Sequence, residues 1–102
     1  MKYVVFSNPA PGQDAAYNDW YSNVHLKDLL DIPGVSGATR YRLQRTDSGP
    51  GSPAHDYLAI YELDGEPGEV MAELMARASD GRIHISDALD VGSVVQGLYE
   101  QI

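Results

Sequence analysis

The sequence predicts an α+β domain in which one antiparallel four-stranded sheet carries two helices on one face. Stretches with the alternating apolar pattern of strands and stretches with helical periodicity follow one another in the order β-α-β-β-α-β. A loop rich in Gly, Pro and Ser, residues 47–53, separates the second and third strand patterns. The length of 102 residues fits a single domain, residues 1–102. This element order is that of the ferredoxin-like, split βαβ motif.

The first strand and the first helix are predicted from composition and from their end signals. Residues 2–7 are β-branched and aromatic, which favours a strand. The first helix begins at Gln13 or Asp14, because Asp14 suits an N-cap, and it ends between residues 25 and 30. Pro33 disfavours a helical conformation in the residue before it and therefore stops the helix.

The rest of the chain supplies three strands and one helix. Residues 35–45 and 55–63 predict the second and third strands. The second helix begins near Pro67, a residue that suits the first helical position. Residues 82–89 predict a short helical turn or a loop, and residues 91–102 predict the fourth strand.

Both faces of the third strand are largely apolar, so both faces of the sheet are expected to be covered. Tyr57, Ala59 and Tyr61 share one face of this strand, and Leu58 and Ile60 share the other. The two helices cover only one face of the sheet. For a chain of this length the expected cover of the other face is a second copy, and we therefore predict a homodimer packed sheet to sheet.

Charge and composition exclude several classes of partner. The net charge is −8, from 7 basic and 15 acidic side chains, which argues against binding to nucleic acid phosphates and to an anionic membrane surface. There is no cysteine, which excludes disulfides, thiolate catalysis and cysteine metal sites. No apolar run reaches membrane-spanning length, and the N-terminus lacks a signal-peptide pattern, so the expected location is cytoplasmic.

One face of the first helix has an unusual composition. At about 100° per residue, the side chains of Tyr17, Trp20, Tyr21, His25 and Asp28 fall within a sector of about 140°. A helix that only packed against a sheet would present Leu, Ile and Ala there. This helix presents hydroxyls, an imidazole and a carboxylate within its apolar stripe, and the pattern predicts that it lines a pocket.

The segment from residue 17 to residue 41 carries a family resemblance. It contains Tyr17-Asn18-Asp19-Trp20-Tyr21, then His25, Asp28-Leu29-Leu30, Ile32-Pro33-Gly34-Val35, Ala38, Arg40 and Tyr41. These residues resemble the N-terminal signature of EthD-like proteins, which belong to the dimeric α/β-barrel superfamily. Members of this family often have proline where this chain has Lys27, and lysine lets the helix continue past His25.

The resemblance implies a dimer with a cavity in each subunit, between the helices and the sheet. Muconolactone-type isomerases, aromatic polyketide cyclases, cofactor-independent monooxygenases and haem-degrading proteins belong to the same superfamily. Many of their cavities perform acid–base chemistry on aromatic or unsaturated small molecules without a metal or a bound cofactor.

Three residues are candidates for catalysis. His25 is the strongest, because an imidazole of near-neutral pKa can take a proton from an acidic carbon or hydroxyl and return it elsewhere. The alternative is a structural histidine at a helix end. Asp28 lies three residues on and can fix the tautomer of His25, or else it is a solvated or turn-capping carboxylate. Arg40 can bind a carboxylate or enolate oxygen, or else pair with one of the many acidic residues.

Five further residues are candidates for binding a substrate: Tyr17, Trp20, Tyr21, Tyr61 and His84. Aromatic rings stack on aromatic ligands, and buried phenols need a hydrogen-bond partner that a ligand oxygen can supply. We expect Trp20 in the core and at least one of the helix tyrosines at the cavity. His84 either closes the cavity mouth or caps a turn. No two histidines have the spacing of a metal-binding pair, so no metal is expected. The resemblance implies that no other bound cofactor is needed.

These features predict a small cofactor-independent enzyme. It would perform isomerisation, cyclisation or a related proton transfer on a hydrophobic, aromatic or polyketide-like small molecule, with His25 as the general acid–base. A cofactor-free monooxygenase that acts on an electron-rich aromatic is one alternative. A non-catalytic small-molecule-binding or accessory protein is another.

Overall fold

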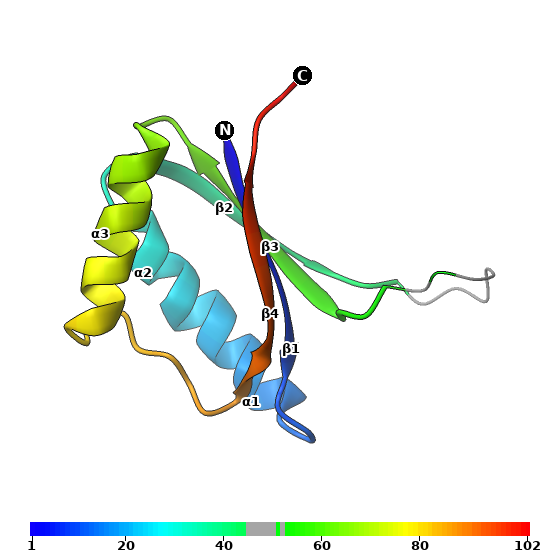
Figure 1. Cartoon of the computed structure of the whole chain (residues 1–102). Coiled ribbons are helices and arrows are strands. Elements are labelled where there is room, and N and C mark those ends of the chain that lie inside the picture. The colour runs from blue at the N-terminus through cyan, green and yellow to red at the C-terminus, as the bar shows by residue number, and fades with distance from the viewer. Residues whose placement is uncertain (45–50, 52) are drawn as a thin grey trace.

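The computed structural model describes residues 1–44, 51 and 53–102. Four strands form one sheet in the order β2-β3-β1-β4, and every neighbouring pair is antiparallel. The strands are β1 (Lys2–Pro9), β2 (Val35–Arg42), β3 (Tyr57–Leu63) and β4 (Leu89–Tyr99). The helices cover one face of the sheet (Figure 1), so the predicted ferredoxin-like arrangement is confirmed. The predicted loop at residues 47–53 falls mostly on residues 45–50 and 52, outside the described residues.

The first helical arm is one continuous run with an irregular middle. It consists of α1 (Asp14–Trp20), the π-helical segment η1 (Tyr21–His25) and α2 (Leu26–Leu30). The sequence predicted the run but not the π-helical segment, in which hydrogen bonds span five residues in place of four. Lys27 lies within α2, so the helix does continue past His25.

The turn after α2 depends on glycine. Gly34 has a φ of +96°, which L side chains rarely adopt, and a Cβ atom there would lie 2.7 Å from Cγ2 of Val70. Because Gly34 has no side chain, the backbone just before β2 can pass close to Val70.

The second helical arm is α3 (Pro67–Ser79). The Glu66 carboxylate accepts a hydrogen bond of 2.8 Å from the backbone N–H of Glu69, which caps the first turn. Arg77, in the last turn, lies 3.0 Å from a carboxylate oxygen of Asp31 and so ties α3 to the end of α2. Residues 80–88 contain turns and no regular helix, which resolves the alternative left open for residues 82–89.

The core lies between the helices and the sheet. Tyr3, Val5 and Ser7 alternate along β1 and are buried on the helix side. Tyr57, Ala59 and Tyr61 of β3 are buried on the same side, as the alternation predicted. Within the described part of the chain, no helix is both long and apolar enough to cross a membrane.

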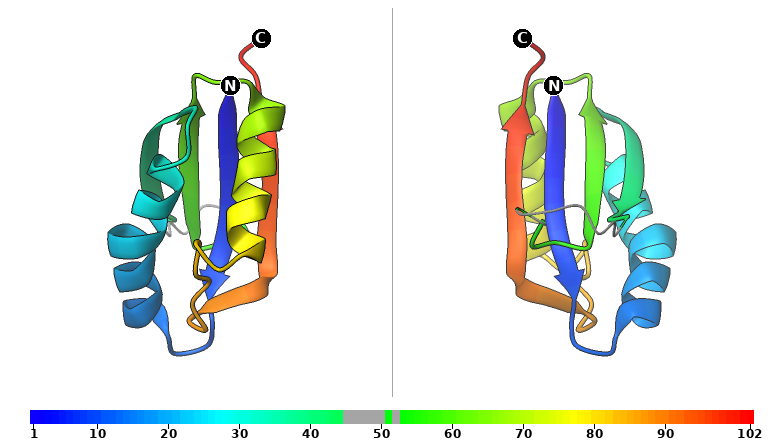
Figure 2. Two further views of the ribbon diagram at one scale, coloured as in Figure 1. Left: turned by 90° about the vertical axis from the view of Figure 1, so that its left-hand side faces the viewer. Right: turned by 90° about the vertical axis from the view of Figure 1, so that its right-hand side faces the viewer.

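No helix covers the opposite face of the sheet, which is seen in the right-hand view of Figure 2. Cross-strand pairs place apolar side chains side by side on this outer face, because Phe6 pairs with Leu58 on one side and with Val95 on the other. Val95 is 55% exposed and Tyr99 is 58% exposed. The outer face is thus a largely apolar surface that the described part of the chain leaves uncovered.

Candidate active site

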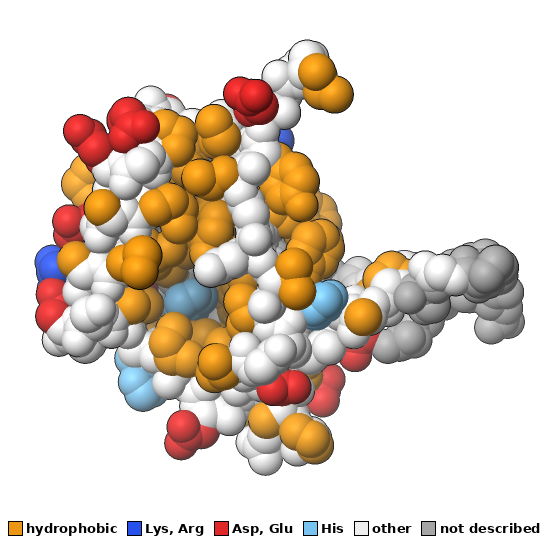
Figure 3. Space-filling model, viewed as in Figure 1, with side chains coloured by type: hydrophobic (Ala, Val, Ile, Leu, Met, Phe, Trp, Pro, Cys, Tyr) orange, Lys and Arg blue, Asp and Glu red, His pale blue; other side chains and the backbone are white. Residues whose placement is uncertain are grey.

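A cavity of about 340 Å³ lies between the helices and the sheet. Hydrophobic side chains surround the hollow in Figure 3, and a histidine is visible inside it. The volume is at the lower end of the range for small-molecule sites, so the cavity suits a compact organic molecule. Its lining comes from β1, the first helical arm, β3, α3, the segment after α3, and β4: Tyr3, Val5, Ser7, Trp20, Tyr21, His25, Leu29, Tyr61, Met71, Leu74, Met75, Ala78, Ile83, Ile85, Leu89, Val91, Val94 and Gln96.

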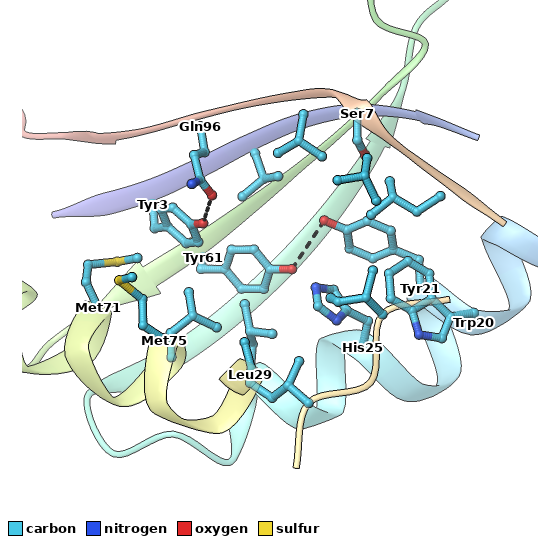
Figure 4. Close-up of a pocket in the computed structure, with 18 residues that line it drawn as sticks. Tyr3, Ser7, Trp20, Tyr21, His25, Leu29, Tyr61, Met71, Met75 and Gln96 are labelled. Atoms are coloured by element: carbon cyan, nitrogen blue, oxygen red, sulfur yellow. Dashed lines mark hydrogen bonds between the residues drawn. The ribbon is translucent and has the colours of Figure 1, made fainter. Parts of the chain in front are cut away.

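Two hydrogen-bonded pairs place phenols in this apolar lining (Figure 4). The hydroxyls of Tyr61 and Tyr21 lie 3.5 Å apart, and Tyr3 donates to the side-chain oxygen of Gln96. Burial raises the pKa of Tyr3 and of Tyr21 to about 12, and it also raises the pKa of Tyr61. The three phenols are therefore protonated at neutral pH. Tyr3 donates to Gln96 and Tyr61 donates to Tyr21, so the hydroxyl of Tyr21 keeps a hydrogen that it can donate to a ligand oxygen.

His25 is the titratable group at the centre of the cavity wall. Its ring stacks on Trp20 with centroids 4.6 Å apart and meets the edge of Tyr21 at 5.0 Å. Its Nδ1 atom is buried and has no hydrogen-bond partner among the described residues. Burial, and then the positive charge of Arg40, lower the pKa of His25 to about 4. At neutral pH the ring is thus uncharged and carries one donor and one acceptor.

The position of His25 depends on the irregular helix. His25 is the last residue of η1, and π-helical turns occur often at functional sites. Tyr21, at the start of η1, and His25, at its end, both line the cavity.

Tyr17 reaches the cavity only through another residue. Its side chain is completely buried and is absent from the cavity lining. Its hydroxyl lies 2.6 Å from Oγ of Ser7, which does line the cavity.

Arg40 lies on the helix side of β2, behind the tyrosine rings as seen from the cavity. Its guanidinium carbon is 4.6 Å from the centre of the Tyr21 ring and 5.4 Å from that of Tyr17. The guanidinium donates hydrogen bonds of 2.8 Å to the side-chain oxygens of Ser22 and Asn18. Arg40 does not line the cavity, so its side chain is not placed to touch a ligand oxygen there.

Two solved structures are similar to this chain in fold. An ethyl tert-butyl ether D (EthD) family protein from Bacillus halodurans C-125 matches with a TM-score of 0.57 and 18% identity, over 98% of this chain and 99% of that one. HapK from Hahella chejuensis matches with a TM-score of 0.54 and 14% identity, over 100% of this chain and 93% of that one. The fold is EthD-like. Neither a protein-family model nor a curated protein matches the sequence.

The EthD-like fold directs two of the predicted site residues away from the cavity. Asp28 lies at a separate charged depression, together with Lys27, Asp31, Arg77, Arg82 and Ile83. The side chain of His84 is exposed, and its backbone carbonyl accepts a hydrogen bond of 3.2 Å from Nε1 of Trp20. Of the eight predicted residues, the cavity of the EthD-like fold brings together four: Trp20, Tyr21, His25 and Tyr61.

Three polar residues of this EthD-like cavity were not predicted from the sequence: Tyr3, Ser7 and Gln96. A signal for the first two was present, since Tyr3, Val5 and Ser7 alternate on one face of the first predicted strand. Gln96 follows from cross-strand pairing, because it lies opposite Val5. Within the described ranges, no three His, Asp or Glu side chains are grouped so that they could hold a metal ion.

Proposed function

We propose that the cavity binds a compact, mainly apolar molecule, aromatic or polyketide-like, and that His25 transfers a proton on it without a bound cofactor. The observation that carries the proposal is an uncharged imidazole in a mainly apolar cavity, with an Nδ1 atom that has no hydrogen-bond partner among the described residues. An imidazole of this kind can take a proton from a carbon next to a carbonyl and return it to another atom of the same molecule.

The phenols around His25 support this chemistry. Removal of a proton next to a carbonyl puts negative charge on the carbonyl oxygen. Protonated Tyr21, which accepts a hydrogen bond from Tyr61, can donate its own hydrogen to that oxygen. The low pKa of His25 makes the ring a weak base in the empty cavity. An enolate formed beside the imidazolium stabilises that cation by direct charge pairing, so the pKa of His25 rises during the step that needs it.

The pKa of His25 also favours a second candidate function, a non-catalytic binding protein. A ring with a pKa of about 4 is suited to donate and accept hydrogen bonds at neutral pH. In that case a ligand binds and leaves unchanged, and substitution of His25 alters affinity only.

Hydrogen–deuterium exchange separates the two candidates. The probe is 2-tetralone, an aromatic ketone with acidic protons next to its carbonyl, and NMR follows deuterium uptake at those carbons in deuterated buffer. We expect the wild-type protein to accelerate exchange and His25→Gln to abolish the acceleration. His55→Gln is the matched control, because His55 lies outside the cavity, where its Nε2 hydrogen-bonds the backbone carbonyl of Ser93 at 2.7 Å. Binding without acceleration would favour the binding protein.

We also infer that the functional unit is a homodimer formed through the outer face of the sheet. Phe6, Leu58 and Val95 form an apolar row across this face, and Lys2 pairs with Glu62 at its end. The charges of that pair cancel, so two copies can meet here although each chain has a net charge of −8. Sheets that pack face to face in this way bury apolar side chains from both partners.

A further inference from the structure

A row of three side chains leads from the cavity to a positive charge behind it. Ser7 lines the cavity, is 1% exposed, and has its Oγ atom 2.6 Å from the hydroxyl of Tyr17. Tyr17 is fully buried, and the Arg40 guanidinium carbon lies 5.4 Å from the centre of its ring. The proton transfer proposed above for His25 does not use this row.

The charge on Arg40 determines which hydroxyl of this row donates the hydrogen bond. Either hydroxyl of the Ser7–Tyr17 pair can be the donor by distance alone. A cation beside a phenol favours the orientation in which the O–H hydrogen points away from the cation, so Tyr17 donates and Ser7 accepts. Burial raises the pKa of Tyr17, and the hydrogen bond with Ser7, followed by the charge and hydrogen bonding of Arg40, acts in the opposite direction.

With Tyr17 as donor, the Ser7 hydroxyl keeps its own hydrogen. A serine hydroxyl has one hydrogen and two lone pairs, and Tyr17 occupies one lone pair. Tyr17 is the partner that the described residues supply for this hydroxyl. A ligand oxygen in the cavity is therefore the expected acceptor for the hydrogen of the Ser7 hydroxyl.

We propose that Ser7 donates a hydrogen bond to the ligand, that Arg40 orients this donor through Tyr17, and that the ligand carries a carbonyl, carboxylate or enolate oxygen at that end. This inference rests on the proposed function and adds the chemistry of the ligand to it. Ser7 is a ligand-binding residue, whereas Tyr17 and Arg40 are positioning residues.

The position of Ser7 sets the direction in which the ligand lies. Ser7 and Tyr3 are four residues apart on β1, which corresponds to ~13 Å along the strand. Figure 4 shows Ser7 toward one end of the cavity, with His25 across from it on the helix side, and Tyr3 and Gln96 toward the other end. A ligand with its oxygen at Ser7 extends its apolar part along β1 toward Tyr3.

A matched pair of probes tests the inference. Acetophenone has a carbonyl oxygen and no donor, and cumene has nearly the same shape and no oxygen. Dissociation constants come from chemical-shift changes in ¹⁵N-resolved NMR spectra, which also report whether each variant is folded. We expect the wild type to prefer acetophenone, and Ser7→Ala to reduce the preference by about two- to tenfold, the effect of one neutral hydrogen bond.

The positioning residues are tested by the same preference. Tyr17→Phe and Arg40→Met are expected to weaken the binding of acetophenone and to leave the binding of cumene unchanged, so the ratio of the two affinities falls. If the two residues only support the fold, both substitutions would weaken the binding of both probes equally. Ser7→Thr and Arg40→Lys keep the donor and the charge and are expected to restore the preference. Arg42→Met is the control, because Arg42 lies near Tyr57 and not near Tyr17 or Tyr21.

The outcomes separate this inference from the proposed function. Equal affinity of the wild type for both probes, or an unchanged preference in Ser7→Ala, would overturn the role of Ser7 and leave the cavity as a binding site. If neither probe binds, both the site and the inference are wrong. If Ser7→Ala does not fold, the test rests on Tyr17→Phe and Arg40→Met. An unchanged preference for acetophenone in both variants would show that Arg40 does not orient Ser7 through Tyr17.

Discussion

The buried imidazole of His25 predicts a pH dependence of stability with a definite sign. Its pKa falls from 6.5 to about 4 on folding, so the unfolded chain binds a proton more readily than the folded one. The stability that comes from this difference is present above pH 6.5 and is lost as the pH falls toward 4. At pH 5.5 the loss amounts to about 1.4 kcal/mol.

The measurement compares urea unfolding of the wild type and of His25→Gln at about pH 7.5 and at about pH 5.5. A pH of 5.5 stays one unit above the isoelectric point of about 4.5, where precipitation would interfere. Glutamine does not titrate, so the wild type is expected to lose about 1.4 kcal/mol more than the variant between the two pH values, while other groups cancel in the difference.

A direct titration of the ring checks the same reasoning. The ring protons of His25 report its pKa by NMR. A ring that titrates between pH 6 and 7, or an equal pH dependence in the two proteins, would show that water solvates the imidazole and that the electrostatic account of the cavity is wrong.

Three further predictions concern other parts of the molecule. Gly34→Ala is expected to destabilise the fold by about 1–3 kcal/mol in urea unfolding, because the new Cβ would clash with Val70 at a positive φ. A variant as stable as the wild type would show that Gly34 and Val70 do not lie this close together. Protonated His25 would quench the fluorescence of the single Trp20 on which it stacks, so the wild type is expected to keep its fluorescence from about pH 7.5 to about pH 5.5, and quenching in this range that His25→Gln lacks would refute the low pKa. Val95→Lys, on the outer face of the edge strand β4, is expected to convert the inferred dimer into a monomer in sedimentation analysis, whereas a variant that stays dimeric would place the interface elsewhere.

The element order could be predicted from the sequence because each strand and helix has its own local period and end signals. Strand β3 is the clearest example, since its alternation predicted that Tyr57, Ala59 and Tyr61 share one face, and all three are buried on the helix side. The end signals were less exact. The predicted second strand ran to residue 45, whereas β2 ends at Arg42, and the fourth strand begins at Leu89, two residues earlier than predicted.

The helix face could be predicted only in part, because a π-helical turn breaks the regular period. One extra residue in a turn rotates everything after it by about 100° relative to a regular helix. The rotation explains why Val24 is 43% exposed and why Asp28 leaves the predicted stripe. It also explains why Leu29, which a regular helix would place outside the stripe, is 3% exposed and lines the cavity. A single sequence carries no clear mark of such a turn.

The remaining site residues depend on contacts between elements that are distant in sequence. Arg40 was expected to touch a ligand because arginine and enolate are complementary. The rings of Tyr17 and Tyr21 lie between its guanidinium and the cavity, and only the packing of α1 on β2 determines that order. Gln96 joins the site through its hydrogen bond with Tyr3, across a pairing that the sequence does not specify.

The methionines of α3 affect which shapes of molecule the cavity can accept. Met71 and Met75 line the cavity, and Met75 is 70% exposed, so its unbranched thioether can swing without disturbing the packed core. The opposite wall is made of ring side chains held in hydrogen-bonded pairs. One wall is thus rigid and sets chemical selectivity, and the other is compliant and tolerates variation in bulk. Oxidation of Met75 to the sulfoxide would stiffen and polarise the compliant wall, so peroxide exposure would narrow the range of accepted molecules before it affected the fold.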